Sequence, residues 1–231
     1  MLESVKRLFT KEGAEGFEKV RQRVKELAKR LSKGEEKRDN TEILEILREY
    51  GAEVAPYQVV SSKGELREAI EELGSPVMVK PITTKVITRS QAGAVIRVES
   101  IEDADAAYAQ VIGRIVSSTP WIGVTGVMAQ EEVKGENKLS LLWQRAKKKG
   151  VPFKWVKRLF RGGEEKEVQV DVASNDELLS QMEELDPSLQ QVVSACHLAW
   201  IDNPELSAME VEIVFGSGVA KVVDARITVF G

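Results

Sequence analysis

The segment that decides the fold, residues 74–95, reads GSPVMVKPITTKVITRSQAGAV. Its short apolar run at residues 77–79 is typical of a buried strand, and it delivers a single cation, Lys80, at its end. A stretch rich in Ser, Thr and Gly follows. An ammonium group is a compact point charge and glycine lets backbone N–H groups approach an anion, so this pattern indicates a phosphate site. The same residues also fit a buried strand whose lysine extends its ammonium group into solvent.

The composition is that of a folded globular protein. The chain has 231 residues, of which 42% are hydrophobic and 30% charged, and no run approaches the ~18 apolar residues of a membrane helix. The first seven residues include an acid and lack a long apolar core, so we expect no secretory signal and a cytoplasmic protein. Abundant Lys and Glu with one Cys would suit a thermophile.

The single cysteine and single histidine exclude several kinds of site. One cysteine, Cys196, cannot form an internal disulfide or a cysteine-cluster metal site, and one histidine, His197, excludes a His-rich metal centre. A nucleophilic triad would have to use His197, which lies in the apolar stretch SLQQVVSACHLAW. We therefore expect both residues to lie on a helix and to pack near the core of the protein.

Hydrophobic periodicity and turn residues predict a mixed α+β chain in two lobes. Helices are predicted at 42–50, 63–73, 101–116, 176–185 and 187–201, and two more within 2–31, where Gly13 and Gly16 are expected to interrupt the pattern. Strands are predicted near 57–60, 77–80, 94–98, 126–130, 139–143, 167–172, 208–215 and 219–223. A polar linker is expected at 33–40.

A strongly basic stretch runs from Arg145 to Arg161 and has three interpretations. It is a solvated lysine-rich face, an anion site for a nucleotide, CoA or an acidic partner, or a nucleic-acid site in which aromatic rings alternate with cations. The net charge of −4 argues against a surface that attracts nucleic acid as a whole.

Four collinear pieces carry a family resemblance: residues 43–51 (ILEILREYG), 77–81 (VMVKP), 129–135 (AQEEVKG), and 210–213 (EVEI) with 222–227 (VVDARI). Together they resemble the ATP-grasp β subunit of the nucleoside-diphosphate-forming acyl-CoA synthetases, especially the archaeal ADP-forming acetyl-CoA synthetases. The resemblance implies a two-lobed α+β ATP-grasp fold. We expect a helical extension at 1–40, an N-lobe at 41–125 and a C-lobe at 126–231.

The resemblance also implies the site residues and cofactors. Lys80 would touch the phosphates of ATP or ADP, and the backbone of a hinge would bind the adenine edge. Two carboxylates on the terminal strands would hold Mg²⁺, a hard cation that demands oxygen ligands. From the residues alone, Glu212 also fits a solvent-facing strand position, and Asp224 fits a pair with Arg226 or another cation. The residues implied are Lys80, Gln130, Glu131, Glu132, Val133, Glu136 and Arg161 for the nucleotide, and Glu212 and Asp224 for the metal.

The chain departs from the family pattern at four positions. Thr88 stands where the family has its phosphate-relay histidine, Gln91 replaces an aspartate, Ala94 replaces a glycine, and Val214-Phe215 replaces Asn-Pro. A threonine cannot form phosphohistidine, so any relay would come from a partner.

Two functions therefore stay open. One is a nucleotide-binding subunit that works with an α-like, CoA-binding partner in the reaction acyl-CoA + ADP + phosphate to acid + CoA + ATP. The other is a degenerate ATP-grasp scaffold or regulatory subunit, a pseudoenzyme that binds a protein partner or a second copy of itself. The N-terminal helices would dock that partner, or would pack against their own lobe.

Overall fold

The computed structural model describes residues 11–33, 40–83, 94–121, 123–135, 137–145, 153–161, 164–172 and 186–230. The chain divides into two compact units. The large unit contains helix α2 (Lys11–Ser32), residues Asn40–Val54 and residues Val133–Gly231, and the small unit contains Ala55–Glu132. The lobe boundaries expected at residues 40 and 125 stay predictions.

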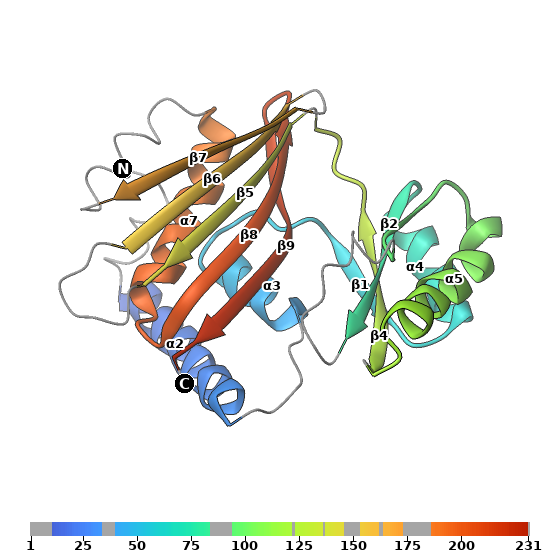
Figure 1. The fold of residues 1–231 in the computed structure, drawn as a ribbon, viewed down its shortest axis with the longest axis horizontal. Coiled ribbons are helices and arrows are strands. Elements are labelled where there is room, and N and C mark those ends of the chain that lie inside the picture. Colours follow the sequence, from blue (N-terminus) through green and yellow to red (C-terminus); the bar gives the residue numbers. More distant parts are fainter. Residues whose placement is uncertain are drawn as a thin grey trace. The chain divides into compact units, whose positions relative to one another are not determined.

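The small unit is a four-stranded antiparallel sheet with two helices (Figure 1). Its elements are β1 (Tyr57–Val60), α4 (Lys63–Leu73), β2 (Val77–Thr83), β3 (Ile96–Val98), a 3₁₀ turn (Ile101–Asp103), α5 (Ala104–Ser118) and β4 (Val124–Glu131), with strand order β1-β4-β2-β3. Helix α4 begins at the predicted residue, and the Ser62 hydroxyl caps it by accepting a hydrogen bond from the Glu65 N–H. It ends at Gly74, whose φ of 77° is favoured by glycine.

One face of this sheet forms the core of the small unit. Val77 and Val79 of β2 and Val127 of β4 are fully buried, and they pack in one cluster with residues of α4 and α5. Side chains alternate between the two faces of a strand, so the residues between them lie on the opposite face. The two described helices of the small unit thus leave that second face uncovered by helix.

The large unit is a five-stranded antiparallel sheet, and helices α2, α3 and α7 lie on one of its faces (Figure 1). The strand order is β7-β6-β5-β8-β9. Its other elements are α3 (Asn40–Glu49), β5 (Asn137–Gln144), β6 (Phe153–Arg161), β7 (Glu164–Val172), α7 (Pro187–Asp202), β8 (Leu206–Gly216) and β9 (Val219–Val229). The helix expected at 176–185 lies outside the described residues.

Helix α2 corrects one prediction, because it runs without a break through Gly13 and Gly16. Its apolar stripe is buried, and its arginines hold it to the same unit: Arg30 donates to Glu42 of α3 at 2.7 Å, and Arg21 pairs with Asp202 of α7. The cost of glycine in a helix is roughly 0.5–1 kcal/mol per residue, which this packing outweighs. Of the two interpretations of these helices, the structure bears out packing against their own unit for α2.

The basic stretch between Arg145 and Arg161 contains a strand that the sequence did not predict. β6 pairs with β5 on one side and β7 on the other. Its register places three basic residues directly opposite acidic ones, in the pairs Lys154 with Asp171, Arg158 with Glu167, and Arg161 with Glu164.

None of the described helices combines the length and apolar character needed to cross a membrane.

Candidate functional site

Lys80 lies near the middle of β2, on the face of the small sheet that its helices do not cover. The residue is only 8% exposed, and its Nζ donates a hydrogen bond to Oε1 of Gln130 at 2.6 Å. Gln130 is 1% exposed and lies on the neighbouring strand β4, where it pairs with Met78. The alternation of side chains puts Lys80, Met78 and Gln130 on one face. The sequence-predicted lysine is thus buried and does not extend into solvent.

The amide nitrogen of Gln130 is the most unusual atom of this face. Nε2 is buried and finds no hydrogen-bond partner among the described residues. Exchanging the amide oxygen and nitrogen would not help, because a lysine ammonium is only a donor and needs the oxygen facing it. An unpaired buried donor costs about 1–3 kcal/mol. The position therefore suits a ligand that brings an acceptor atom.

Apolar side chains surround this polar pair on the same face. Met128, the register partner of Lys80, is 1% exposed, and Ile82 is 3% exposed. Met78 is half-buried between Lys80 and the end of the strand. This face therefore combines adaptable apolar side chains with two hydrogen-bond donors.

The segment expected to form the hinge is held by hydrogen bonds at the end of β4. The Glu131 N–H donates to Pro56 O at 2.9 Å, and the Glu132 N–H donates to Pro76 O at 3.3 Å. The Glu132 carboxylate pairs with Arg97 of β3. At the next residue, Val133, the chain returns to the large unit.

The two carboxylates expected to bind metal are neighbours in the large unit. Glu212 of β8 and Asp224 of β9 are register partners, so both lie on the same face of the sheet, opposite to the buried face that includes Val211 and Ile213. Glu212 is half-buried, and Asp224 is 8% exposed. The hairpin of the two terminal strands therefore brings these two residues together as the sequence suggested.

Each of these carboxylates has a cation beside it. Lys138 Nζ lies 2.6 Å from Glu212 Oε2, and Arg226 Nη2 lies 3.3 Å from Asp224 Oδ2. The other Asp224 oxygen, Oδ1, accepts the Ala225 N–H. No cluster of three or more His, Cys, Asp or Glu that could hold a metal occurs among the described residues. Two carboxylates suit Mg²⁺ when nucleotide phosphates and water complete its shell.

The structure does not describe the side chains of several expected site residues. Glu136 and Thr88, together with Gln91, lie outside the described residues. Arg161 is the last residue of β6 and pairs with Glu164 in the register, but its side chain is not described. Their assignment to the site stays a prediction.

Cys196 and His197 belong to the core, as expected. Burial raises the pKa of the Cys196 thiol to about 12. His197 Nδ1 accepts a hydrogen bond from the indole N–H of Trp143 at 3.2 Å. Burial, and then the charge of Arg145, lowers the pKa of His197 to about 4, so the ring is neutral at pH 7.

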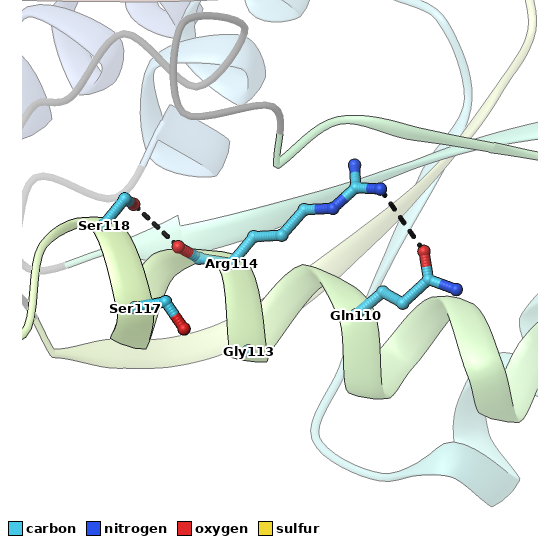
Figure 2. Close-up of a pocket in the computed structure, with 5 residues that line it drawn as sticks. All are labelled: Gln110, Gly113, Arg114, Ser117 and Ser118. Atoms are coloured by element: carbon cyan, nitrogen blue, oxygen red, sulfur yellow. Dashed lines mark hydrogen bonds between the residues drawn. The ribbon is translucent and has the colours of Figure 1, made fainter.

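A hollow on the small unit does not involve this face (Figure 2). It is lined by five residues of α5: Gln110, Gly113, Arg114, Ser117 and Ser118. Because a single helix supplies this lining, the hollow cannot enclose a nucleotide, and none of the sequence-predicted site residues lines it.

Two side chains at these sites were missed by sequence reasoning. Arg97 and Lys138 lie on strands that were predicted, or nearly so, but their partners Glu132 and Glu212 are distant in sequence. Only the strand pairing reveals these contacts, and no local signal marks either residue.

Comparisons with known proteins identify the family. A model of the ATP-grasp domain matches residues 29–151, more than half of the chain. The ADP-forming acetate–CoA ligase I of Archaeoglobus fulgidus is 28% identical over 119 residues, which are 52% of this chain and 17% of that protein. The chain thus spans about a sixth of that relative's length.

Solved structures share the fold. The dinucleotide-forming acetyl-coenzyme A synthetase 1 of Candidatus Korarchaeum cryptofilum, in complex with coenzyme A and Ca-AMPCP, matches with a TM-score of 0.69 at 20% identity, covering 82% of this chain and 92% of that one. A protein of Pyrococcus horikoshii Ot3 matches with a TM-score of 0.67 at 14% identity, covering 94% and 98%. The α+β fold expected from the sequence is confirmed.

Proposed function

This chain belongs to the ATP-grasp domain family, and we propose that it is a nucleotide-binding subunit that takes ATP or ADP on the helix-free face of its small sheet. The buried contact between Lys80 and Gln130 carries this proposal. Gln130 is uncharged, so its hydrogen bond to Lys80 does not itself neutralise the ammonium group. The unpaired Nε2 offers a second donor in the same place.

The adenine ring would lie beside Met78, Met128 and Ile82, with its edge at the end of β4. The N–H groups of Glu131 and Glu132 are already used within the small unit. Val133 would therefore supply the N–H for the base edge. Glu136 and Arg161 are assigned to the same nucleotide by the family resemblance.

Glu212 and Asp224 would hold the Mg²⁺ that accompanies the nucleotide. The metal supplies charge neutralisation at the phosphate oxygens. The two carboxylates would orient it, and Lys138 and Arg226 hold them in place when the nucleotide is absent. Both carboxylates lie on one face of one sheet, which suits the one or two carboxylate ligands that Mg²⁺ usually takes from a protein.

The full reaction would be that of the ADP-forming acyl-CoA synthetases, acyl-CoA + ADP + phosphate to acid + CoA + ATP. It requires an α-like partner that supplies the CoA site and the phosphohistidine, because Thr88 has no nitrogen to phosphorylate. The similarity to the Archaeoglobus ligase supports this proposal, although this chain spans only 17% of that protein.

Isothermal titration tests the nucleotide proposal. The chain should bind ATP in the presence of Mg²⁺, and Lys80→Ala should weaken binding at least 100-fold, since a charge-assisted contact and the desolvated site are both lost. Lys63→Ala removes an exposed lysine of the same unit and should leave the affinity unchanged. Absence of ATP binding at millimolar nucleotide would reject the proposal.

A second function is favoured by the large unit. Both candidate metal ligands are paired with cations, and Val214 stands where the family has an asparagine oxygen. These features fit a non-catalytic scaffold that keeps the fold and binds a protein partner. Purifying the chain with whatever co-elutes from its host, and assaying that complex for acyl-CoA-dependent phosphorylation of ADP, separates the two functions. Turnover that depends on this chain excludes the scaffold.

A further inference from the structure

Arg97 forms a side-chain clamp across a strand of the small sheet. Arg97 lies on β3, which is hydrogen-bonded to β2, while Glu132 directly follows β4 on the other side of β2. The guanidinium donates from Nε to Glu132 Oε1 at 2.6 Å and from Nη2 to Oε2 at 2.9 Å. A two-point contact of this kind fixes direction as well as distance.

The clamp acts on the point where the chain leaves the small unit. Glu132 is the last residue of that unit, and its N–H is bonded to Pro76 O. The N–H of the preceding residue, Glu131, is bonded to Pro56 O. These contacts hold two consecutive residues through their backbone, and Arg97 adds a side-chain contact to Glu132 from a third strand.

The clamp lies on the same face as Lys80 and Gln130. Met78 pairs with Arg97 on one side and with Gln130 on the other, so the three residues form one row across the sheet. Arg97 also contacts Glu99 on its own strand. The guanidinium thus lies at one end of the row, with the polar pair at the other.

We propose that Arg97 is a positioning residue for base recognition, holding residues 131 and 132 so that the N–H of the next residue, Val133, meets the edge of the nucleotide base. The inference rests on the proposed nucleotide function. Arg97 itself touches neither base nor phosphate. Loss of the clamp removes the two-point contact that orients Glu132, while the proposed Lys80 contact with phosphate is left intact.

In this proposal, Arg97 affects recognition of the base, and Lys80 binds the phosphates. A ligand with a base should suffer from the loss of Arg97, and a ligand with phosphates alone should not. ATP and inorganic tripolyphosphate are a suitable pair of probes, with tripolyphosphate measured by competition against ATP.

Titrations of four proteins test the proposal: the wild type, Arg97→Ala, Arg97→Lys and Arg67→Ala. Arg67 is the matched control, because it pairs with Asp105 at 2.7 Å between helices α4 and α5 of the same unit. We expect Arg97→Ala to weaken ATP about tenfold and to leave tripolyphosphate within about twofold. Arg97→Lys should recover part of the loss, since lysine keeps the charge but not the two-point contact. Arg67→Ala should change neither ligand.

The outcomes are distinct. ATP affinity unchanged in Arg97→Ala overturns the positioning role alone. An equal loss for ATP and tripolyphosphate also overturns it, because it would mean that Arg97 supports the whole face. Failure of the wild type to bind ATP overturns the nucleotide function and this inference together. In the double variant Arg97→Ala/Glu132→Ala, a loss no greater than that of Arg97→Ala supports the pair acting as one unit.

Discussion

On the sheet of the small unit, Lys80 is hydrogen-bonded to a neutral amide, whereas on the sheet of the large unit Glu212 and Asp224 each lie beside a cation. Gln130 keeps a buried donor without a partner, but neither carboxylate is among the described groups that lack one. The two sheets come from one chain and differ in what a ligand would find on them.

The difference in partners determines which of the two faces gains more free energy when a ligand binds. A phosphate or ring nitrogen that reaches Lys80 and Gln130 adds an acceptor where one is missing, so the desolvation cost of the buried donor is recovered on binding. A metal that reaches Glu212 must compete with Lys138, and one that reaches Asp224 must compete with Arg226. We therefore expect the nucleotide to bind without the metal more readily than the metal binds without the nucleotide.

The largest effect on this comparison is expected from Gln130→Glu, which replaces the neutral amide beside Lys80 with a carboxylate. The substitution removes the unpaired donor and places a negative charge beside the phosphates. We expect ATP affinity to fall about 1,000-fold, equivalent to about 4 kcal/mol, measured by isothermal titration.

The control for this change is Gln58→Glu. Gln58 is in the same unit and donates to Glu72 at the exposed surface. That variant should bind ATP as the wild type does. If Gln130→Glu retains wild-type affinity, the neutral partner of Lys80 is irrelevant to binding.

The stability of the large unit should also decrease in acid. The only histidine of the chain, His197, lies in the large unit, and burial with the charge of Arg145 lowers its pKa from 6.5 to about 4. The unfolded state therefore binds a proton between pH 6.5 and pH 4 that the folded state does not, so stability falls as pH falls through this window. The loss amounts to about 3 kcal/mol.

Urea unfolding from pH 7 to pH 4 checks this prediction, with the fluorescence of buried Trp143 and Trp200 reporting on the large unit. His197→Gln has no group that titrates in this range. The difference in stability between wild type and variant should change with pH in the predicted direction, and parallel curves would show that His197 is not the cause.

Gly135 lies close to strand β8 in the sheet of the large unit, so a substitution there tests this packing. A Cβ at this position would lie 2.7 Å from Val214 Cγ1 and 2.8 Å from Phe215 O. Gly135→Ala should therefore destabilise the protein by about 1–3 kcal/mol, measured by urea unfolding. Gly16→Ala is the matched control in helix α2, where a Cβ meets nothing within 4 Å. It should stabilise by about 0.5–1 kcal/mol, and a neutral Gly135→Ala would contradict the packing described.

The smallest effect is expected from Lys138→Met, which frees Glu212 from its cation. Mn²⁺ affinity, measured by electron paramagnetic resonance without nucleotide, should rise about tenfold, or about 1.4 kcal/mol. Lys134→Met removes an equal charge from an exposed position in the same unit and should change it far less. An unchanged affinity in Lys138→Met would mean that Lys138 does not compete with the metal.

Much of this architecture follows from local sequence signals. Ser62 and Gly74 mark the ends of α4 because capping and positive φ are properties of single residues. The alternating strands around Glu212 and Asp224 predict a hairpin, and a hairpin places the two carboxylates near one another. The pairing of Asp224 with Arg226 was one of the two interpretations drawn from the sequence, and the structure contains it.

Other features depend on pairing between distant segments. Lys80 and Gln130 are 50 positions apart, and their contact follows only once β2 is known to lie beside β4. The strand β6 was hidden because cations and aromatic residues mask its alternation. The expected break at Gly13 and Gly16 was wrong because helix propensity is weaker than the ion pairs and apolar contacts that hold α2.

The measurement closest to the central claim is the side-chain amide signal of Gln130 in ¹⁵N-glutamine-labelled protein during titration with ATP and Mg²⁺, assigned with a Gln130→Met variant. The account predicts that the Nε2 protons of Gln130 shift and exchange more slowly as ATP binds, because they gain an acceptor, while those of Gln58 stay as they are. An unchanged Gln130 signal at saturating ATP would contradict it.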